Sequence, residues 1–475
     1  MIKPLILVFG LWATIGAASV MQMSGGAVVV SGGNASASIT SSRQRGGVEL
    51  FLDVENIETI SGATQSVNKP AKYGSAAIFG DDATDTWDDD KRTSGIFKYG
   101  DGDWRMWYQG NPDEFHATNQ ITYLCYAVST NGINWTRPTV GLTSYNGSTT
   151  NNIVSPAAVA RDTGWIVSTN VSGSFGSISF GNFYWSSTTG TNWSQGPDVT
   201  PTGESYVTWG STDFFLMRKS NTWRTYSQLY LDSKRVGGIA YGGANITNTY
   251  TPRAIAMPGA GSLSTSDQRY FWRVKYHAGN WLGFVSEFSQ ASNMLHLDLY
   301  FSRDGFSWAE VSDAWIPNGG GAAWDSKMIF GGKNLIREGN TWRYYYDGSD
   351  VLHNVSEDFN IQIGLATIGY ERIGQVGTTG TVVMRPITPT GGLLINTDAS
   401  GGTLKAALFN ANTGVVMTGY DYTDFDTISS DTYSTAGTWG GLAIPQGTPV
   451  RVGFTLSSAT LYSYSAGVPV SQVIE

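Results

Sequence analysis

Acidic residues stand ahead of several aromatic, alternating segments of this chain at a roughly similar spacing. They are Asp88, Asp213, Asp267 and Asp325, and Glu287 is a further acid in the fourth segment. Two carboxyl groups that face each other can cleave a glycosidic bond, because one protonates the leaving oxygen while the other activates water or attacks the sugar. A third negative charge nearby raises the pKa of the proton donor.

Each of these acids also has a structural interpretation. Asp88 belongs to the acidic stretch 81–90, which could be a solvated loop or a cation-binding loop. Asp213 stands alone at the head of an apolar run, where an aspartate that caps a turn is an equal alternative, and Asp325 is similar. At the level of sequence these alternatives stay open.

Flat rings and polar side chains near the acids are candidates for holding a sugar. Trp209, Trp272 and Trp324 fall beside the acids, and an indole ring can stack on a pyranose face while polar neighbours bind the hydroxyls. Packing between repeats would explain each ring equally well. Asn152 occupies the place of an acid in the second repeat, and Arg218 could bind an anionic sugar or form a salt bridge.

The elements that must position these residues repeat along the chain. A tryptophan recurs every 58 to 61 residues, at Trp104, Trp165, Trp223, Trp281 and Trp342. A second series, Ser-x-x-Gly-x-x-Trp, runs in phase at Ser129–Trp135, Ser187–Trp193 and Ser302–Trp308, and it is typical of a tight hairpin turn. Five units of strand and turn predict an all-β chain that contains a five-bladed β-propeller.

The period ends near Gly374, and this end sets the predicted domains. We expect the propeller at 48–375 and a β-sandwich at 376–475, where alternating strands are separated by Gly, Asn and Asp turns. Residues 20–47 are a linker rich in Gly and Ser. Residues 1–19 have the pattern of a signal peptide, and an arm retained for assembly with another chain through 1–47 is the alternative.

Composition limits the classes of partner and cofactor. A formal net charge of −9 and a pI near 5 argue against a nucleic-acid partner. The apolar run near the N-terminus is short for a spanning helix, so we expect no membrane span in the mature chain. Cys125 lies in an apolar segment and is expected in the core. The four histidines show no close metal-ligand spacing, so neither a metal nor another cofactor is predicted.

Several segments together resemble the five-bladed propellers of glycoside hydrolase families 32 and 43. They are 104–108, 126–142, 151–154, 302–308 and 323–330, followed by a tail, 391–402 and 438–441 among others, that is similar to the accessory β-sandwich of that group. The resemblance implies a carbohydrate-active protein, glycoside hydrolase-like, that acts on a polysaccharide or glycan at the mouth of the propeller channel.

The same resemblance implies roles for individual acids. Asp88, or Asp89 beside it, would be the base, Asp213 the modulator, and Asp267 or Glu287 the proton donor. The Trp-Met-Asn-Asp-Pro, Arg-Asp-Pro and Glu-Cys motifs of family 32 are absent. A non-catalytic carbohydrate-binding or adhesion protein is therefore the main alternative, and a structural assembly subunit is a third. The expected location is secreted, extracellular or periplasmic, or, under the alternative, a virion or cell-surface appendage.

Overall fold

The structure is a computed structural model, and every regular element in the residues that it describes is a β-strand, which confirms the all-β prediction. The described ranges are 47–80, 87–112, 121–156, 159–160, 166–169, 175–179, 183–198, 208–219, 222–231, 234–241, 251–254, 267–332, 334–355 and 360–467. Between 157 and 266, side chains are described only at 185–195, 226 and 237–239. No described segment is a helix long and apolar enough to cross a membrane.

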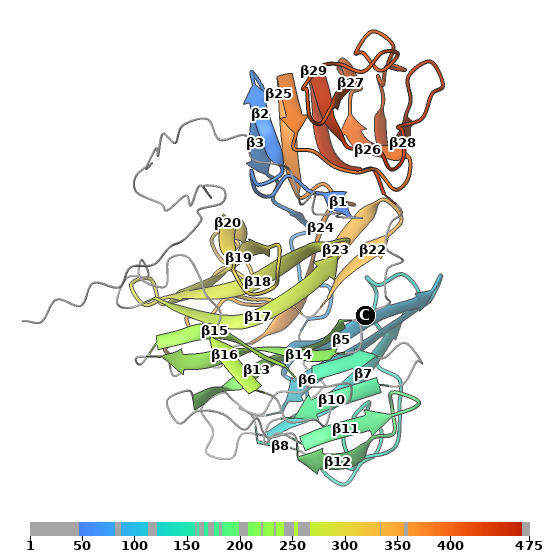
Figure 1. Ribbon diagram of the computed structural model, residues 1–475. Helices are drawn as coiled ribbons and strands as arrows, with labels where there is room; N and C mark the ends of the chain where they lie inside the picture. The colour runs from blue at the N-terminus through green and yellow to red at the C-terminus, as the bar shows by residue number, and fades with distance from the viewer. Residues whose placement is uncertain are drawn as a thin grey trace, which may run out of the picture. The chain divides into compact units, whose positions relative to one another are not determined.

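Three antiparallel sheets of four strands follow the first three sequence repeats (Figure 1). The first contains β5 (Asp90–Gly100), β6 (Asp103–Asn111), β7 (Ile121–Ser129) and β8 (Val159–Ala160). The second contains β9 (Ile166–Thr169), β10 (Phe175–Ser179), β11 (Phe183–Ser187) and β12 (Ser194–Asp198). The third contains β13 (Thr208–Lys219), β14 (Thr222–Leu231), β15 (Lys234–Tyr241) and β16 (Thr251–Ala254).

A nine-stranded sheet contains the fourth and fifth repeats. Its first half is β17 (Gln268–His277), β18 (Asn280–Ser289), β19 (Met294–Ser302) and β20 (Ala309–Ile316). Its second half is β21 (Met328–Phe330), β22 (Leu335–Glu338), β23 (Thr341–Ser349), β24 (Gln362–Gly369) and β4 (Ala71–Lys72). A parallel pair, Leu295 with Met328, joins the two halves. Because β4 pairs with β24, a strand that precedes the first repeat completes the last one.

An eight-stranded sheet contains the C-terminal strands. Its members are β1 (Val48–Glu49), β2 (Ile57–Ser61), β3 (Thr64–Val67), β25 (Gly374–Met384), β26 (Leu393–Asp398), β27 (Thr403–Asn410), β28 (Asp431–Gly437) and β29 (Val450–Ser465). Residues 48–67, which the sequence-based boundaries place with the propeller, pair here with β25 and β29 instead (blue beside orange and red in Figure 1). Strands that pair across some 300 residues of intervening chain leave no local pattern in the sequence.

The repeating tryptophan packs on the turn of its own repeat. Trp104 and Trp281 are buried, and a Cβ on the turn glycines Gly132 and Gly305 would come within 3.0 Å of their rings. Both glycines have φ near +70° to +81°, in the left-handed region that favours glycine. In these two repeats, the recurring tryptophan and the glycine of the Ser-x-x-Gly-x-x-Trp turn therefore contact each other.

An aromatic residue three positions after the tryptophan reaches the turn of the next repeat. Three such bonds are described: Trp107 Nε1 to the Gly190 carbonyl at 2.6 Å, the Tyr226 hydroxyl to the Gly305 carbonyl at 3.3 Å, and the Tyr345 hydroxyl to the Gly132 carbonyl at 2.7 Å. In the last, Arg343 also donates to the carbonyl of Asn131. This third contact runs from the fifth repeat back to the first.

Candidate functional site

Asp88 and Asp325 occupy equivalent places in the first and fifth repeats. Each follows a tryptophan and precedes the first strand of its repeat. The Tyr108 hydroxyl donates to Asp88 Oδ2 at 2.6 Å, and the Tyr346 hydroxyl donates to Asp325 Oδ2 at 2.8 Å. Both tyrosines stand four residues after the repeating tryptophan, so the same hydrogen bond between tyrosine and aspartate occurs in both repeats.

Each of these two carboxylates is buried and paired with a base. Asp88 is fully buried, with Arg137 Nε at 3.1 Å from its Oδ2. Asp325 is 2% exposed, with Lys72 Nζ at 2.5 Å from its Oδ2. Because Lys72 belongs to β4, the second pair fastens the strand that completes the last repeat. Burial together with a neutralising base suits a scaffold contact, and a sugar does not reach a buried carboxylate.

Asn152 and Trp324 pack around the same two tyrosines. The Asn152 amide nitrogen donates to the Tyr108 hydroxyl at 2.7 Å, and its oxygen accepts from Trp87 Nε1 at 2.8 Å. The Trp324 ring stacks on Tyr346, with ring centroids 5.5 Å apart and 23° between the planes. In this arrangement both side chains bind neighbouring protein groups.

Trp272 and Asp267 lie at the first strand of the fourth repeat, β17. Trp272 is fully buried against Gly237 of β15, with its ring centroid 5.9 Å from that of Trp308. Asp267 Oδ1 accepts the backbone amide of Gln290 at 3.3 Å, as an aspartate that caps a turn does. Their positions therefore fit packing and capping.

Asp213, Trp209 and Arg218 lie on β13, of which only the backbone is described. The pairing of β13 with β14 is irregular between Trp209 and Phe214, so Asp213 falls in a bulge within the strand. Bulges re-aim side chains and are common beside functional sites. The side chains of these three residues lie outside the described part of the chain, and their roles stay predictions.

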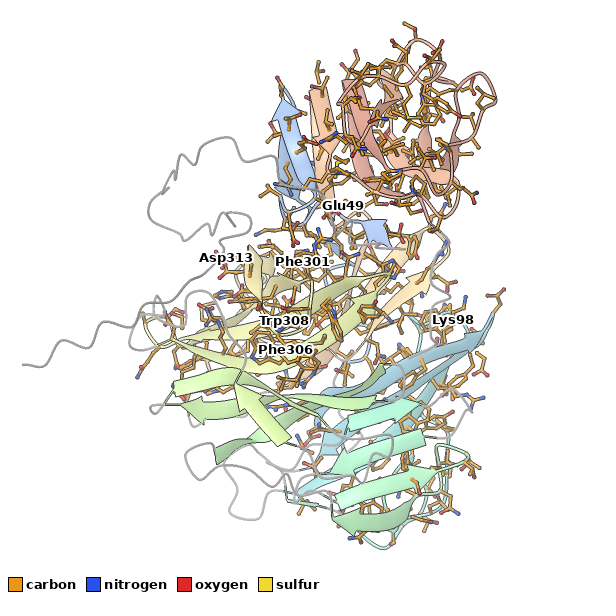
Figure 2. All side chains as sticks on the ribbon, in the orientation of Figure 1. Glu49, Lys98, Phe301, Phe306, Trp308 and Asp313 are labelled. Atoms are coloured by element: carbon orange, nitrogen blue, oxygen red, sulfur yellow. The ribbon has the colours of Figure 1, made fainter. Side chains whose placement is uncertain are left out.

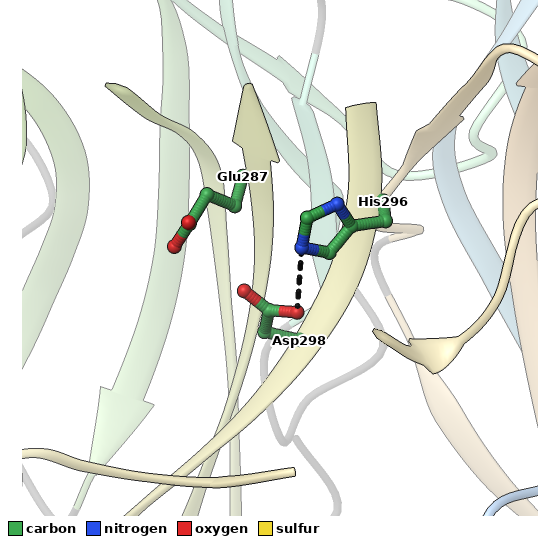
Figure 3. Close-up of side chains that lie close together, drawn as sticks. All are labelled: Glu287, His296 and Asp298. Carbon is green, nitrogen blue, oxygen red and sulfur yellow. Dashed lines mark ion pairs between the residues drawn. The ribbon is translucent and has the colours of Figure 1, made fainter. Parts of the chain in front are cut away.

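Glu287 belongs to a row of side chains across three strands of the fourth repeat. Arg269 of β17 pairs with Glu287 of β18, which pairs with His296 of β19, so the three share one face of the sheet. Asp298 lies two residues beyond His296 and projects to the same face. Figure 3 shows Glu287, His296 and Asp298 converging, and one donor atom of each lies within 4.8 Å of the others.

Strand β20 adds two more carboxylates, and we call the six residues the Glu287 cluster: Arg269, Glu287, His296, Asp298, Glu310 and Asp313. Arg269 Nε lies 3.7 Å from Glu287 Oε2 and donates to the Tyr300 hydroxyl, which in turn donates to Glu310. The Asp313 side chain is exposed (Figure 2), and the Glu287 side chain is 19% exposed. Solvent therefore reaches the cluster, whereas Asp298 is buried.

Negative charge is in excess in the Glu287 cluster, where four carboxyl groups face two bases. Burial, and then the charge of Asp298, raise the pKa of Glu287 to about 7. Arg269 and His296 act in the opposite direction but do not compensate. At neutral pH the Glu287 carboxyl is therefore close to half protonated.

His296 keeps a proton in the same cluster. Burial alone would lower its pKa, but the bond to Asp298 and the charges of Asp298, Asp313 and Glu287 raise the pKa to about 9. Its Nε2 lies 3.3 Å from Asp298 and 3.2 Å from Asp313. Three donor groups this close could share a cation, which would have to displace the proton from His296.

Glu287 was named from the sequence, but its neighbours were missed. Along the chain, His296 shows no metal-type or catalytic spacing, because its partners come from strand pairing. One signal was present: the β18–β19 hairpin pairs Ser289 with Met294 and therefore Glu287 with His296. Counting back from the turn would have found that pair, although not the contact with Asp313.

Comparison with protein families and with curated proteins finds no match. Several solved structures of carbohydrate-active proteins are similar. One is a glycosyl hydrolase from Bacteroides ovatus (TM-score 0.43, 9% identity, covering 65% of this chain and 95% of that chain). Another is the catalytic domain of the Coprinopsis cinerea GH62 α-L-arabinofuranosidase (TM-score 0.42, 13% identity, 63% and 97%).

A third similar structure comes from work on the GH130 family of mannoside phosphorylases, described as containing glycoside hydrolases that target β-1,2 mannosidic linkages in Candida mannan. Its TM-score is 0.43 at 9% identity, covering 66% of this chain and 96% of that chain. With TM-scores below 0.5 these likenesses are coarse, so the assignment of a site rests on this chain's own residues.

Proposed function

We propose that this chain is a carbohydrate-active, glycoside hydrolase-like protein in which Glu287 is the proton donor. The observation that carries the proposal is the state of this one carboxyl group, which is partly exposed, close to Asp298, and has its pKa raised to about 7. A general acid must hold a proton at the working pH and release it in the transition state, which is easiest when its pKa lies near that pH.

Glu287 is preferred over Asp267, the other donor that the family resemblance implies. Asp267, which precedes β17, accepts the backbone amide of Gln290 in the turn after β18. Glu287 instead faces further negative charge, which favours its protonated form. Asp213, which the family resemblance implies as the modulator of the donor, stays a prediction, because its side chain lies outside the described part of the chain.

The five repeats are proposed to form a five-bladed β-propeller with a C-terminal β-sandwich. The supporting observation is the repeated bond from an aromatic side chain to the next turn, which also joins Tyr345 of the fifth repeat to Gly132 of the first. The strand β4 adds a second link, since it comes from before the first repeat and completes the fifth.

A screen that reports both binding and cleavage of glycans tests the activity. Wild type is expected to cleave at least one glycan, and Glu287→Gln is expected to bind that glycan without cleaving it. Asp304→Asn is the matched control, because it removes a carboxylate from the same repeat at a turn where the first repeat has Asn131. Cleavage by Glu287→Gln at the wild-type rate would refute the assignment.

The alternative is a carbohydrate-binding or adhesion protein without catalysis. One observation favours it: Asp88 and Asp325, two of the expected acids, are buried in scaffold pairs. Binding of a glycan by wild type with no cleavage in the same screen would support this alternative. Either function fits an extracellular or periplasmic location or a virion or surface appendage, which stays a prediction because residues 1–46 lie outside the described ranges.

A further inference from the structure

A short segment from the N-terminal part of the chain lies against the outer side of the Glu287 cluster. We call residues 68–70, between β3 and β4, the strap. Lys69 Nζ donates to the backbone carbonyl of Asp313 at 2.9 Å. The indole nitrogen of Trp315, a fully buried residue, donates to the carbonyl of Asn68 at 2.9 Å. The strap thus contacts β20 on both sides of Ala314.

Ala314 is the residue that these two contacts enclose. Its φ is +43°, in the left-handed region where a residue other than glycine is disfavoured and persists only when its surroundings hold it. Its amide donates to Asp298 Oδ1 at 2.8 Å. The strained residue therefore supplies a hydrogen bond to the carboxylate whose charge acts on Glu287.

The strap is itself anchored at both ends. β3 pairs with β25, and β4 pairs with β24. Between them, the Asn68 amide donates to the Ile373 carbonyl at 2.6 Å, and its side chain donates to the Arg372 carbonyl at 2.9 Å. A segment held at both ends and in the middle can fix the backbone of β20.

We propose that the strap positions the proton donor: Asn68 and Lys69 hold residues 313–315 of β20 so that the Ala314 amide and the Asp313 carboxylate keep Asp298 and His296 in place beside Glu287. Asn68 and Lys69 are positioning residues, since neither touches a reacting atom. The inference rests on the proposed role of Glu287 and assigns control of that carboxyl group to a segment more than 200 residues away.

Charged groups face Glu287 from three strands, namely Arg269 of β17, His296 and Asp298 of β19, and Glu310 and Asp313 of β20. Tyr226 and Ile239 are the described side chains that the β13–β16 sheet adds to the same side of the core. Of these groups, Asp298 and Asp313 depend on the backbone that the strap holds. If that backbone loosens, Asp298 is less firmly held near Glu287, and Glu287 ionises more easily.

Two single substitutions in the full-length protein test the strap. Trp315→Phe keeps a packed ring but removes the N–H that bonds Asn68, and Lys69→Met removes the contact to Asp313 from an exposed side chain. Lys98→Met is the control, because Lys98 forms its ion pairs away from the strap, with Asp101 in the β5–β6 turn and Glu338 of β22.

Two readouts report the effect. The first is the pH profile of glycan cleavage, and the second is the titration of the Glu287 carboxyl by 13C NMR, assigned by its absence in Glu287→Gln. Both strap variants are expected to move the alkaline limb and the Glu287 titration down by about 0.5 to 1 pH unit. Lys98→Met is expected to move neither.

Unchanged Glu287 titrations in folded strap variants would overturn the proposal, and so would a loss of activity that is equal at every pH. If wild type cleaves no glycan, the proposed function fails, but the NMR titration still decides whether the strap positions Glu287. If Trp315→Phe does not fold, Lys69→Met decides alone, because its side chain is exposed.

Discussion

Asp88 and Asp325 carry the same functional group as Glu287, but the charges around them are balanced differently. Each aspartate has a base within 3.1 Å and accepts a tyrosine hydroxyl. Glu287 has its base, Arg269, at 3.7 Å, which is longer than a hydrogen bond, and it shares its surroundings with other carboxyl groups. The first arrangement ties a buried carboxylate to a base and a tyrosine, whereas in the second, burial and the charge of Asp298 raise the pKa of Glu287 to about 7.

The difference teaches that Asp88 and Asp325, which share one register, are held by contacts that belong to the repeat itself. In the first and fifth repeats, the residue four positions after the tryptophan is a tyrosine that holds the aspartate. In the fourth repeat that position is Val285, which offers no hydroxyl. Chemistry is proposed where the repeat departs from its pattern, because the base that faces Glu287, Arg269, lies beyond hydrogen-bond distance.

The largest expected effect separates the two kinds of carboxylate by activity. Glu287→Gln is expected to lower kcat/KM for the glycan about 100- to 10,000-fold, because it removes the general acid. Its stability should be unchanged or slightly higher, since one of several like charges is lost. Steady-state kinetics and urea unfolding measure both. Loss of stability with intact cleavage would make Glu287 a scaffold carboxylate like Asp88.

A large loss of stability is expected at the scaffold pairs. Asp88→Asn and Asp325→Asn should each lower the free energy of unfolding by about 3 kcal/mol, because each removes the charge of a buried carboxylate that pairs with Arg137 or Lys72. Denaturant unfolding measures the loss, and Asp101→Asn, in an exposed ion pair, is the control that should show no change. If both buried variants were as stable as wild type, Asp88 and Asp325 would not be scaffold carboxylates, and the contrast with Glu287 would be wrong.

Stability should fall as the pH rises, because two groups of the Glu287 cluster have raised pKa values. The protonated form of Glu287 contributes stability that is complete below its ordinary pKa of 4.5 and is lost as the pH rises through about 7. For His296 the contribution is complete below 6.5 and is lost through about 9.

Urea unfolding between pH 5 and pH 9 checks this sign. The free energy of unfolding should decline by roughly 1 to 2 kcal/mol over the range, after allowance for partial exposure. Glu287→Gln should flatten the acidic part of the curve, and His296→Gln should flatten the alkaline part. A profile that rises with pH would contradict the raised pKa of Glu287.

The smallest expected effect tests whether the two scaffold contacts are copies. Tyr108→Phe and Tyr346→Phe each remove one hydroxyl that donates to a buried aspartate and keep the ring. Each should cost about 1 kcal/mol of unfolding free energy, with the larger loss at Tyr108, because its hydroxyl also accepts the Asn152 amide. Thermal unfolding of both variants side by side is sufficient, and a silent substitution at one site alone would show that the sites differ.

Parts of the fold were predictable because their contacts are local. Each repeating tryptophan packs on the turn glycine of its own repeat, so the spacing of Trp104 and Gly132 records a real contact. The all-β class followed from the same alternation. The partners of β1 to β4 were not predictable, because these strands pair with segments some 300 or more residues away.

The candidate site was predictable only in part. Spacing from the tryptophan singled out Asp88 and Asp325, which are indeed equivalent in the structure, but equivalent as scaffold contacts. The spacing of residues along the sequence does not show whether an acid is buried or which base faces it. Glu287 entered by family resemblance, and its distinguishing neighbours, His296 and Asp313, come from other strands.

By itself, the sequence determined that the chain is built from repeated β units with one tryptophan and one turn in each, because that pattern records contacts within a repeat. Only the tertiary structure decided which carboxyl groups pair with a base, as Asp88 and Asp325 do, and that the pKa of Glu287 is raised. The physical reason is that the pKa of an acid depends on its burial and on charges within a few ångströms, and for Glu287 those charges are brought together by strand pairing across β17 to β20.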